Sequence, residues 1–143
     1  MSINKITLED IDIFKAYETL DHYQDIATHS AIYPGQGTPL GLAYVALKLN
    51  GEAGEFAEHV GKAMRDDGLT PLDSKGGKVA RLDQKLTKER RNLLIKEIGD
   101  ILWYCSAACN ELGISFSYAA LENLLKLKDR SERDKLQGSG DNR

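Results

Sequence analysis

The sequence of 143 residues predicts an all-α protein built as a four-helix bundle. Apolar residues recur at helical spacing in four segments, which are separated by stretches rich in glycine and proline. Capping residues stand in front of three of these segments, and no stretch shows the strict alternation of apolar and polar residues that a half-buried strand needs. Four amphipathic helices can bury one core by packing together as a bundle.

The first helix is expected to begin after Thr7 and to run towards Ala27. The Thr7 hydroxyl can cap its first turn, and Asp10 can reach back to the cap in a capping-box pattern. Two prolines and two glycines in residues 33–39 then break the helical pattern.

The second helix is expected from about Pro39 to about Met64. Thr38 supplies a capping hydroxyl, and Pro39 suits the first helical position because its missing N–H would have no partner there. Residues 65–83 contain three glycines and a proline and read as a long loop, which in a compact domain is commonly functional or disordered.

The third helix is expected from near Thr87 to Gly113, and Ser115 can cap a fourth that reaches about Arg133. Residues 1–136 are therefore expected to form a single helical domain, followed by a tail at 137–143. The chain length and the hydrophobic content of 41% are sufficient for one continuous core.

The composition limits the kinds of molecule that the protein can be expected to bind. A net charge of −3 gives no basic surface for a nucleic-acid polymer, although a local group of cations could still bind one small triphosphate. No apolar run is long enough to cross a membrane and no secretion signal is seen, so we expect a soluble, cytoplasmic protein. Cys105 and Cys109 lie one helical turn apart on an apolar segment, where buried free thiols are expected.

Four acids border the two apolar stripes that should face the core. On helical geometry, Glu52 and Glu55 lie one turn apart beside one stripe, and Glu97 and Asp100 lie one turn apart beside the other, on the same face as Tyr104. The stripe residues are Leu42, Val45, Ala46, Leu49, Ala53, Phe56 and Val60 on the second helix, and Leu94, Ile98, Ile101, Leu102, Cys105, Cys109 and Leu112 on the third. Antiparallel packing of these helices would bring the four acids to one place.

Four converging carboxylates would raise one another's pKa values, and a hard divalent cation would relieve that repulsion. Mg²⁺ prefers such oxygen ligands. Paired acids are also common on solvated helix faces, so spacing alone supports a metal site and a solvated surface about equally. Nearby, Glu58 is expected to pair with Lys62, and His59 is expected at the rim of the site.

The two acid pairs, Glu52-Ala-Gly-Glu55 and Glu97-Ile-Gly-Asp100, resemble the signature of the MazG-like all-α nucleoside triphosphate pyrophosphohydrolases. The likeness extends to residues 23–24, 49–58, 96–104, 123–127 and 138–143 and to Arg130. The sequence differs from the family pattern in two ways. The gap between the two acid pairs, residues 56–96, is longer than usual, and no Glu stands just before Glu52. The resemblance implies the four-helix bundle of this all-α NTP pyrophosphatase type.

The resemblance also implies the reaction, which is Mg²⁺-dependent hydrolysis of a (deoxy)nucleoside triphosphate between the α- and β-phosphates to a monophosphate and pyrophosphate. Mn²⁺ can substitute for Mg²⁺ in such sites. It implies metal ligands at Glu52, Glu55, Glu97 and Asp100, with Glu55 as the water-activating base, and substrate contacts from Lys126, Arg130, Tyr104, Asn123, Gln24 and Trp103. For the last group, roles in the core, in helix capping or at a basic helix end stay open.

Self-association as a dimer or tetramer is expected, because a bundle this small has more apolar positions on its third helix than one chain can cover. Two other readings remain. A di-iron carboxylate bundle would need a Glu-x-x-His pair on two helices, and the sequence contains none. A non-enzymatic helical interaction module would not explain why both acid pairs border apolar stripes.

Overall fold

The computed structural model contains four helices, α1 (Ile13–Thr28), α2 (Pro39–Asp66), α3 (Lys88–Glu111) and α4 (Phe116–Glu132). It describes residues 13–69 and 86–133, with side chains from residue 19 onward. Within these ranges there is no strand, so the predicted all-α class is confirmed. The expected start after Thr7, most of the 65–83 loop and the 137–143 tail lie outside the described residues.

Capping residues begin three of the helices, and two of them, Thr38 and Ser115, are the predicted ones. The side chains of Thr38, Thr87 and Ser115 each accept a hydrogen bond from a backbone N–H in the first turn of α2, α3 and α4. Gly113 has a φ of 66° just beyond the end of α3, a conformation that glycine adopts without strain. The boundaries predicted for the second, third and fourth helices are confirmed to within about two residues.

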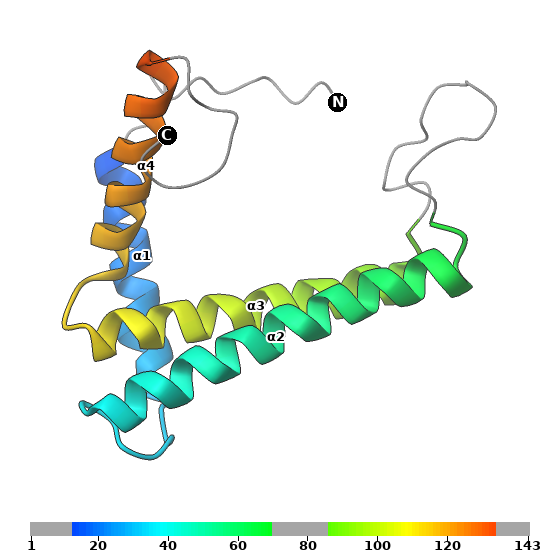
Figure 1. Cartoon of the computed structure of the whole chain (residues 1–143), viewed down its shortest axis with the longest axis horizontal. Coiled ribbons are helices and arrows are strands. Elements are labelled where there is room, and N and C mark those ends of the chain that lie inside the picture. The colour runs from blue at the N-terminus through cyan, green and yellow to red at the C-terminus, as the bar shows by residue number, and fades with distance from the viewer. Residues whose placement is uncertain (1–12, 70–85, 134–143) are drawn as a thin grey trace.

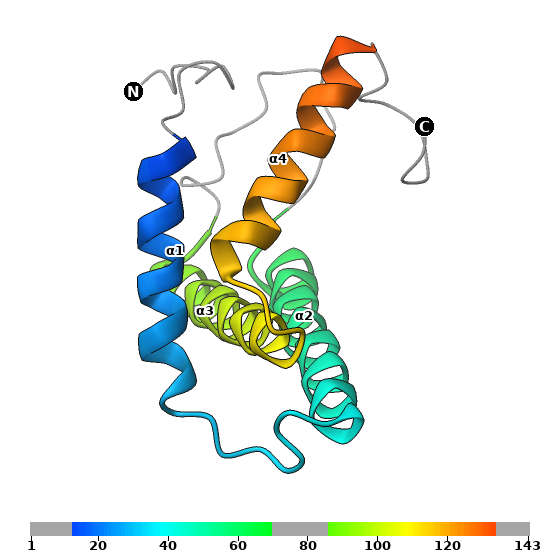
Figure 2. The same ribbon diagram turned by 90° about the vertical axis from the view of Figure 1, so that its left-hand side faces the viewer.

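The helices form two antiparallel pairs that cross one another, as Figures 1 and 2 show. α2 packs along α3, and α1 packs along α4. The α1–α4 pair stands across the end of the hairpin where α2 begins and α3 ends, and there it packs on α3. Among the described residues, α2 packs against α3 and against neither α1 nor α4. Along most of the hairpin, each of its two helices is therefore covered only by the other, as far as the described residues show.

The interior of the single chain is small and partly polar. The buried apolar residues are Val45, Ala63, Ala107 and Cys109, and the buried polar residues are Gln24, Glu52, Glu97, Ser106, Ser117 and Arg130. Cys109 is a free thiol, as predicted, and Cys105, also free, is partly buried.

The prediction that the two apolar stripes face the core of the chain is wrong for several members. Ala46 and Ala53 on α2 are exposed, and Ile98, Leu102 and Leu112 on α3 are 46%, 42% and 59% exposed. The reason is that, within the described residues, α2 packs on α3 alone, and α1 and α4 reach only one end of α3 (Figure 1). Most of these positions therefore have no helix to cover them.

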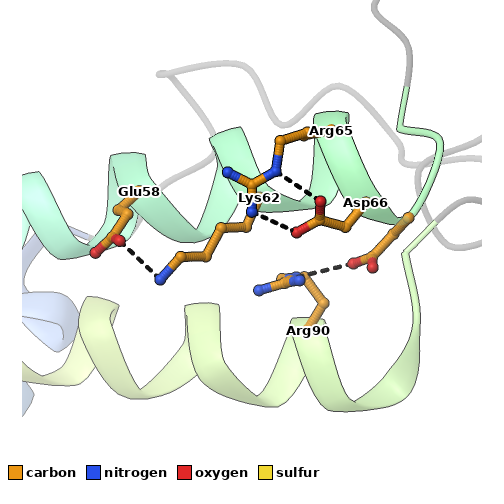
Figure 3. Close-up of polar contacts among 6 residues, drawn as sticks. Glu58, Lys62, Arg65, Asp66 and Arg90 are labelled. Atoms are coloured by element: carbon orange, nitrogen blue, oxygen red, sulfur yellow. Dashed lines mark hydrogen bonds and ion pairs between the residues drawn. The ribbon is translucent and has the colours of Figure 1, made fainter.

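Ion pairs fasten the outer end of the α2–α3 hairpin (Figure 3). Arg90 Nε at the start of α3 lies 2.8 Å from Asp67 Oδ2 at the end of α2, and both side chains are largely shielded from solvent. On α2 itself, Lys62 Nζ lies 2.7 Å from Glu58 Oε1, which confirms the predicted structural pair. The Arg90–Asp67 pair holds the two helices together where the chain leaves α2 and returns to α3.

Gln24 of α1 joins three parts of the fold. Its side-chain amide donates to Asn110 Oδ1 at 2.6 Å and to the carbonyl of Ile114 at 3.1 Å. Its carbonyl accepts from the backbone N–H of Phe116 at 2.6 Å. Because Gln24 is only 6% exposed, this side chain fixes the turn between α3 and α4 on α1.

Gln24→Ala should therefore lower the free energy of unfolding by about 2 kcal/mol, since it leaves donors and acceptors at the α3–α4 turn without partners. Urea denaturation followed by circular dichroism measures the change. Gln36→Ala is the matched control, because Gln36 is exposed and donates only to nearby loop carbonyls, and it should change stability by less than about 0.5 kcal/mol. Equal effects of the two substitutions would contradict this role for Gln24.

Glu111 of α3 holds the segment between α1 and α2. Its carboxylate accepts from Tyr33 Oη at 2.6 Å and from the backbone N–H of Gly37 at 2.9 Å. The Tyr33 ring stacks on Tyr44 and meets Trp103 edge-on. Burial and the bond to Glu111 raise the pKa of Tyr33 to about 12.

Because the folded-state pKa of Tyr33 is raised, its contribution to stability is complete below pH 10 and is lost as the pH rises towards about 12. A difference titration of tyrosinate absorbance, wild type minus Tyr33→Phe, should rise well above pH 10. A difference that titrates at the ordinary tyrosine pKa would show that Tyr33 is not bonded to Glu111 in solution.

Candidate metal centre

Three of the four acids converge between α2 and α3. One carboxylate oxygen from each of Glu52, Glu55 and Glu97 lies within 4.8 Å of the others. Glu52 and Glu97 are only 9% and 8% exposed, while Glu55 is exposed. The spacing of one helical turn puts Glu52 and Glu55 on one side of α2, and the antiparallel packing of α3 brings Glu97 opposite them.

Asp100 lies one turn beyond Glu97 on α3 and is not part of this group of three. Its side chain is exposed. Burial, and after it the charge of Asp100, raise the pKa of Tyr23.

Two basic side chains of α2 contact the buried acids. Lys48 Nζ lies 3.3 Å from Glu52 Oε1 and 5.9 Å from the centre of the Tyr104 ring. One turn beyond Glu55, His59 Nε2 lies 3.5 Å from Glu97 Oε1, and His59 Nδ1 is buried without a hydrogen-bond partner. The position expected for His59, at the rim of the acids, agrees with this contact. Lys48 and His59 thus bracket the acidic cluster along α2.

The donor set fits a hard divalent cation. All three converging ligands are carboxylate oxygens, which suit Mg²⁺ and Mn²⁺ better than they suit zinc or copper. Two of the acids are buried, where their mutual repulsion is least screened by water. Lys48 offsets only part of this charge, so a cation of charge two would stabilise the group.

Aromatic side chains stand beside the acids on α3. The Tyr104 and Trp103 rings meet edge-on with centroids 4.8 Å apart. Trp103 Nε1 donates to the carbonyl of Ala27 and to Ser30 Oγ, both at 3.0 Å, which fixes its orientation. Burial raises the pKa of Tyr104, and the Lys48 ammonium beside the ring opposes that rise. Tyr104 therefore lies between the acidic cluster and the fixed Trp103 ring.

The candidate substrate contacts on α4 are not brought to the acids within one chain. Asn123 and Lys126 are exposed, whereas Arg130 is 6% exposed. α4 packs on α1 and on the end of α3, and it does not pack on α2 within the described residues. Figure 1 shows α4 rising away from the α2–α3 hairpin. Gln24 also lies at the α3–α4 turn, with both of its amide N–H groups engaged there.

The model of the MazG nucleotide pyrophosphohydrolase domain matches residues 42–133, which include the acids of α2 and α3 and the cations of α4. The chain belongs to this family. It is also 40% identical, over 127 residues, to the Gene 37 protein of Mycobacterium phage L5, with 87% of this chain and 98% of the phage protein covered. The name of that relative specifies no activity. No solved structure matches the chain significantly.

Membership of the MazG family confirms the resemblance seen in the sequence and assigns the domain to the nucleotide pyrophosphohydrolases. MazG domains generally depend on a divalent metal ion, and the carboxylate cluster of α2 and α3 offers a place for one. None of the helices in residues 13–69 and 86–133 is long and apolar enough to span a bilayer.

Sequence reasoning misses Lys48 and the Tyr33–Tyr44 stack. Lys48 stands four residues before Glu52, a spacing typical of helical ion pairs, so this contact was open to prediction. The stack joins a loop to α2, and no local pattern indicates such a contact.

Proposed function

We propose that this MazG domain hydrolyses a nucleoside or deoxynucleoside triphosphate between the α- and β-phosphates and releases a monophosphate and pyrophosphate in a Mg²⁺-dependent reaction. The observation that carries this proposal is the meeting of Glu52, Glu55 and Glu97 oxygens within 4.8 Å at the centre of the α2–α3 contact. Family membership supplies the reaction class.

Bound Mg²⁺ or Mn²⁺ would supply positive charge to the phosphate oxygens and lower the pKa of a nearby water. Glu52 and Glu97, which are buried and opposed, would hold the ion, with Asp100 as a further ligand from the next turn of α3. Glu55 is the exposed member of the cluster. We assign it the role of base, which accepts a proton from the attacking water, because it combines access to solvent with proximity to the other two acids.

Neighbouring side chains suggest how the nucleoside is held. Tyr104 stands beside the acids and can pack on the sugar. Trp103, fixed by hydrogen bonds inside the chain, is proposed as part of the base pocket. Its N–H is engaged within the chain, so its ring would contribute a rigid wall. Gln24 is buried at the α3–α4 turn and is not proposed as part of this pocket.

We also propose that the chain works as a homo-oligomer, a dimer or a tetramer. Among the side chains that the structure describes, thirteen large apolar ones are exposed, including Leu47 at 76%, Ile95 at 52% and Ile98 at 46%. Surfaces of this kind mark interaction sites in folded proteins. Lys126 and Asn123, which are exposed, would then contact the phosphates of a substrate across an interface between copies, because α4 and α2 do not pack together in one chain. Arg130 is only 6% exposed, so the phosphate contact that the resemblance implies for it would need a rearrangement of α4.

The test is a panel of ribo- and deoxyribonucleoside triphosphates incubated with the purified protein in Mg²⁺, in Mn²⁺ and in chelator. Pyrophosphate and the monophosphate should appear in equal amounts with at least one substrate, and only with metal. Failure of every substrate to release pyrophosphate would overturn the proposal, and release of inorganic phosphate with a diphosphate product would overturn the assigned bond. The cytoplasmic location expected from the sequence stays a prediction.

A further inference from the structure

Lys48 occupies a position next to the proposed metal centre that none of the expected roles explains. Its ammonium lies 3.3 Å from Glu52 Oε1, an oxygen of one of the two buried acids, and 5.9 Å from the centre of the Tyr104 ring. The Lys48 side chain is 44% exposed, whereas that of Glu52 is 12% exposed. A cation that is partly accessible to solvent is therefore paired with a shielded anion.

This pairing holds the positive charge of Lys48 close to the acids. A lysine ammonium is charged at neutral pH, and the distance of 3.3 Å places it against Glu52 Oε1. The face of an aromatic ring also attracts a cation. Without a divalent ion, the ammonium offsets part of the repulsion among Glu52, Glu55 and Glu97.

A divalent ion bound to the same acids would lie close to this ammonium. Both cations are attracted to the same carboxylates, and they repel each other. Lys48 has a flexible four-carbon stem and an exposed side chain, so it can withdraw into water when the ion binds. The energy of its contact with Glu52 is then lost, and this loss weakens metal binding.

We propose that Lys48 is a built-in counter-ion of Glu52 that stabilises the metal-free acidic cluster and competes with the divalent ion, so that it sets the metal affinity of the site. This inference rests on the metal centre of the proposed function and adds a residue that controls its loading. It also predicts reciprocity, since the coupling between Lys48 and Glu52 should be present without metal and reduced when metal is bound.

The test is calorimetric titration of the full chain with Mn²⁺ and with Mg²⁺. Lys48→Met should bind the ion about tenfold more tightly than wild type, which is the order of effect of one unit charge on a divalent charge a few ångströms away in a water-like medium. Its melting temperature without metal should fall, and the rise on adding metal should exceed that of wild type. Lys48→Arg keeps the charge and should keep the wild-type affinity.

Lys62→Met is the matched control. Lys62 pairs with Glu58 on the same helix with the same spacing of four residues and a similar exposure, 37%, and that pair does not include a cluster acid. Its metal affinity should equal that of wild type. If the wild type binds metal and Lys48→Met binds it equally well or more weakly, the counter-ion role alone is overturned. A wild type that binds no divalent ion would overturn the proposed metal centre together with it.

Discussion

Replacement of Glu52 by glutamine is expected to lower kcat/KM for triphosphate hydrolysis by about 100-fold or more, because it removes a charge on which metal binding and transition-state stabilisation depend. Glutamine keeps the size of the side chain, so the helical circular dichroism should remain that of wild type. The measurement is steady-state release of pyrophosphate in saturating Mg²⁺, with metal affinity determined in parallel.

Glu58→Gln provides the control for this experiment. It makes the same chemical change one turn beyond Glu55 on α2, at an exposed acid that pairs with Lys62. Activity should stay within about twofold of wild type, as for most surface substitutions away from a functional site. Retention of full Mg²⁺-dependent activity by Glu52→Gln would remove the carboxylate cluster from the reaction.

Gly41→Ala is expected to produce the largest loss of stability, about 2 kcal/mol or more in the free energy of unfolding. A Cβ at Gly41 would lie 2.4 Å from the carbonyl oxygen of Gly35 and 2.8 Å from Glu111 Oε2. The same Gly35 carbonyl accepts the backbone N–H of Gly41 at 3.0 Å. The added methyl would therefore push the preceding loop off the start of α2 and disturb the carboxylate that holds Tyr33.

Gly61→Ala tests whether that loss is specific to position 41. Gly61 lies in the same helix, and a Cβ there would meet nothing within 4 Å. Alanine is the better helix former, so this variant should gain about 1 kcal/mol. Urea denaturation of both variants measures the difference. A Gly41→Ala variant as stable as wild type would show that the 33–38 segment does not pack on α2 in solution.

Helix boundaries could be predicted because they depend on local chemistry. The hydroxyls of Thr38, Thr87 and Ser115 each satisfy a free N–H in the first turn of the following helix, and Gly113 adopts the positive φ that ends α3. These interactions involve residues a few positions apart, and the order of residues alone is enough to reveal them.

The direction of each helix face could not be predicted in the same way. Periodicity shows that Ala46 and Ala53 share a side of α2 but does not show which neighbour covers that side. The approach of Glu52 to Glu97 across the hairpin joins residues 45 positions apart in sequence. Within the described residues, no helix other than α3 packs on α2 to cover its apolar stripe. An apolar stripe that serves an interface between copies has the same pattern as one that serves a core.

The candidate site was predictable in its chemistry and less so in its arrangement. The spacing of Glu52, Glu55 and Glu97 indicated that they would converge if the two helices packed as antiparallel neighbours, and the structure brings these three together. Asp100 lies outside the three-oxygen group although its spacing from Glu97 matches that of the α2 pair, because side-chain length and direction also decide whether an oxygen reaches the centre. The direction in which α4 leaves α3 depends on the turn between them, which Gln24 of α1 holds through contacts distant in sequence.

The most direct test of the metal centre is a crystal of the full chain soaked in Mn²⁺ and measured at a wavelength where manganese scatters anomalously. An anomalous peak should lie in the cluster of Glu52, Glu55 and Glu97, at about 2.2 Å from the oxygens of Glu52 and Glu97, as expected for a small hard cation on carboxylate ligands. A peak elsewhere, or none at a Mn²⁺ concentration that supports hydrolysis, would contradict the assignment of the catalytic metal to this cluster.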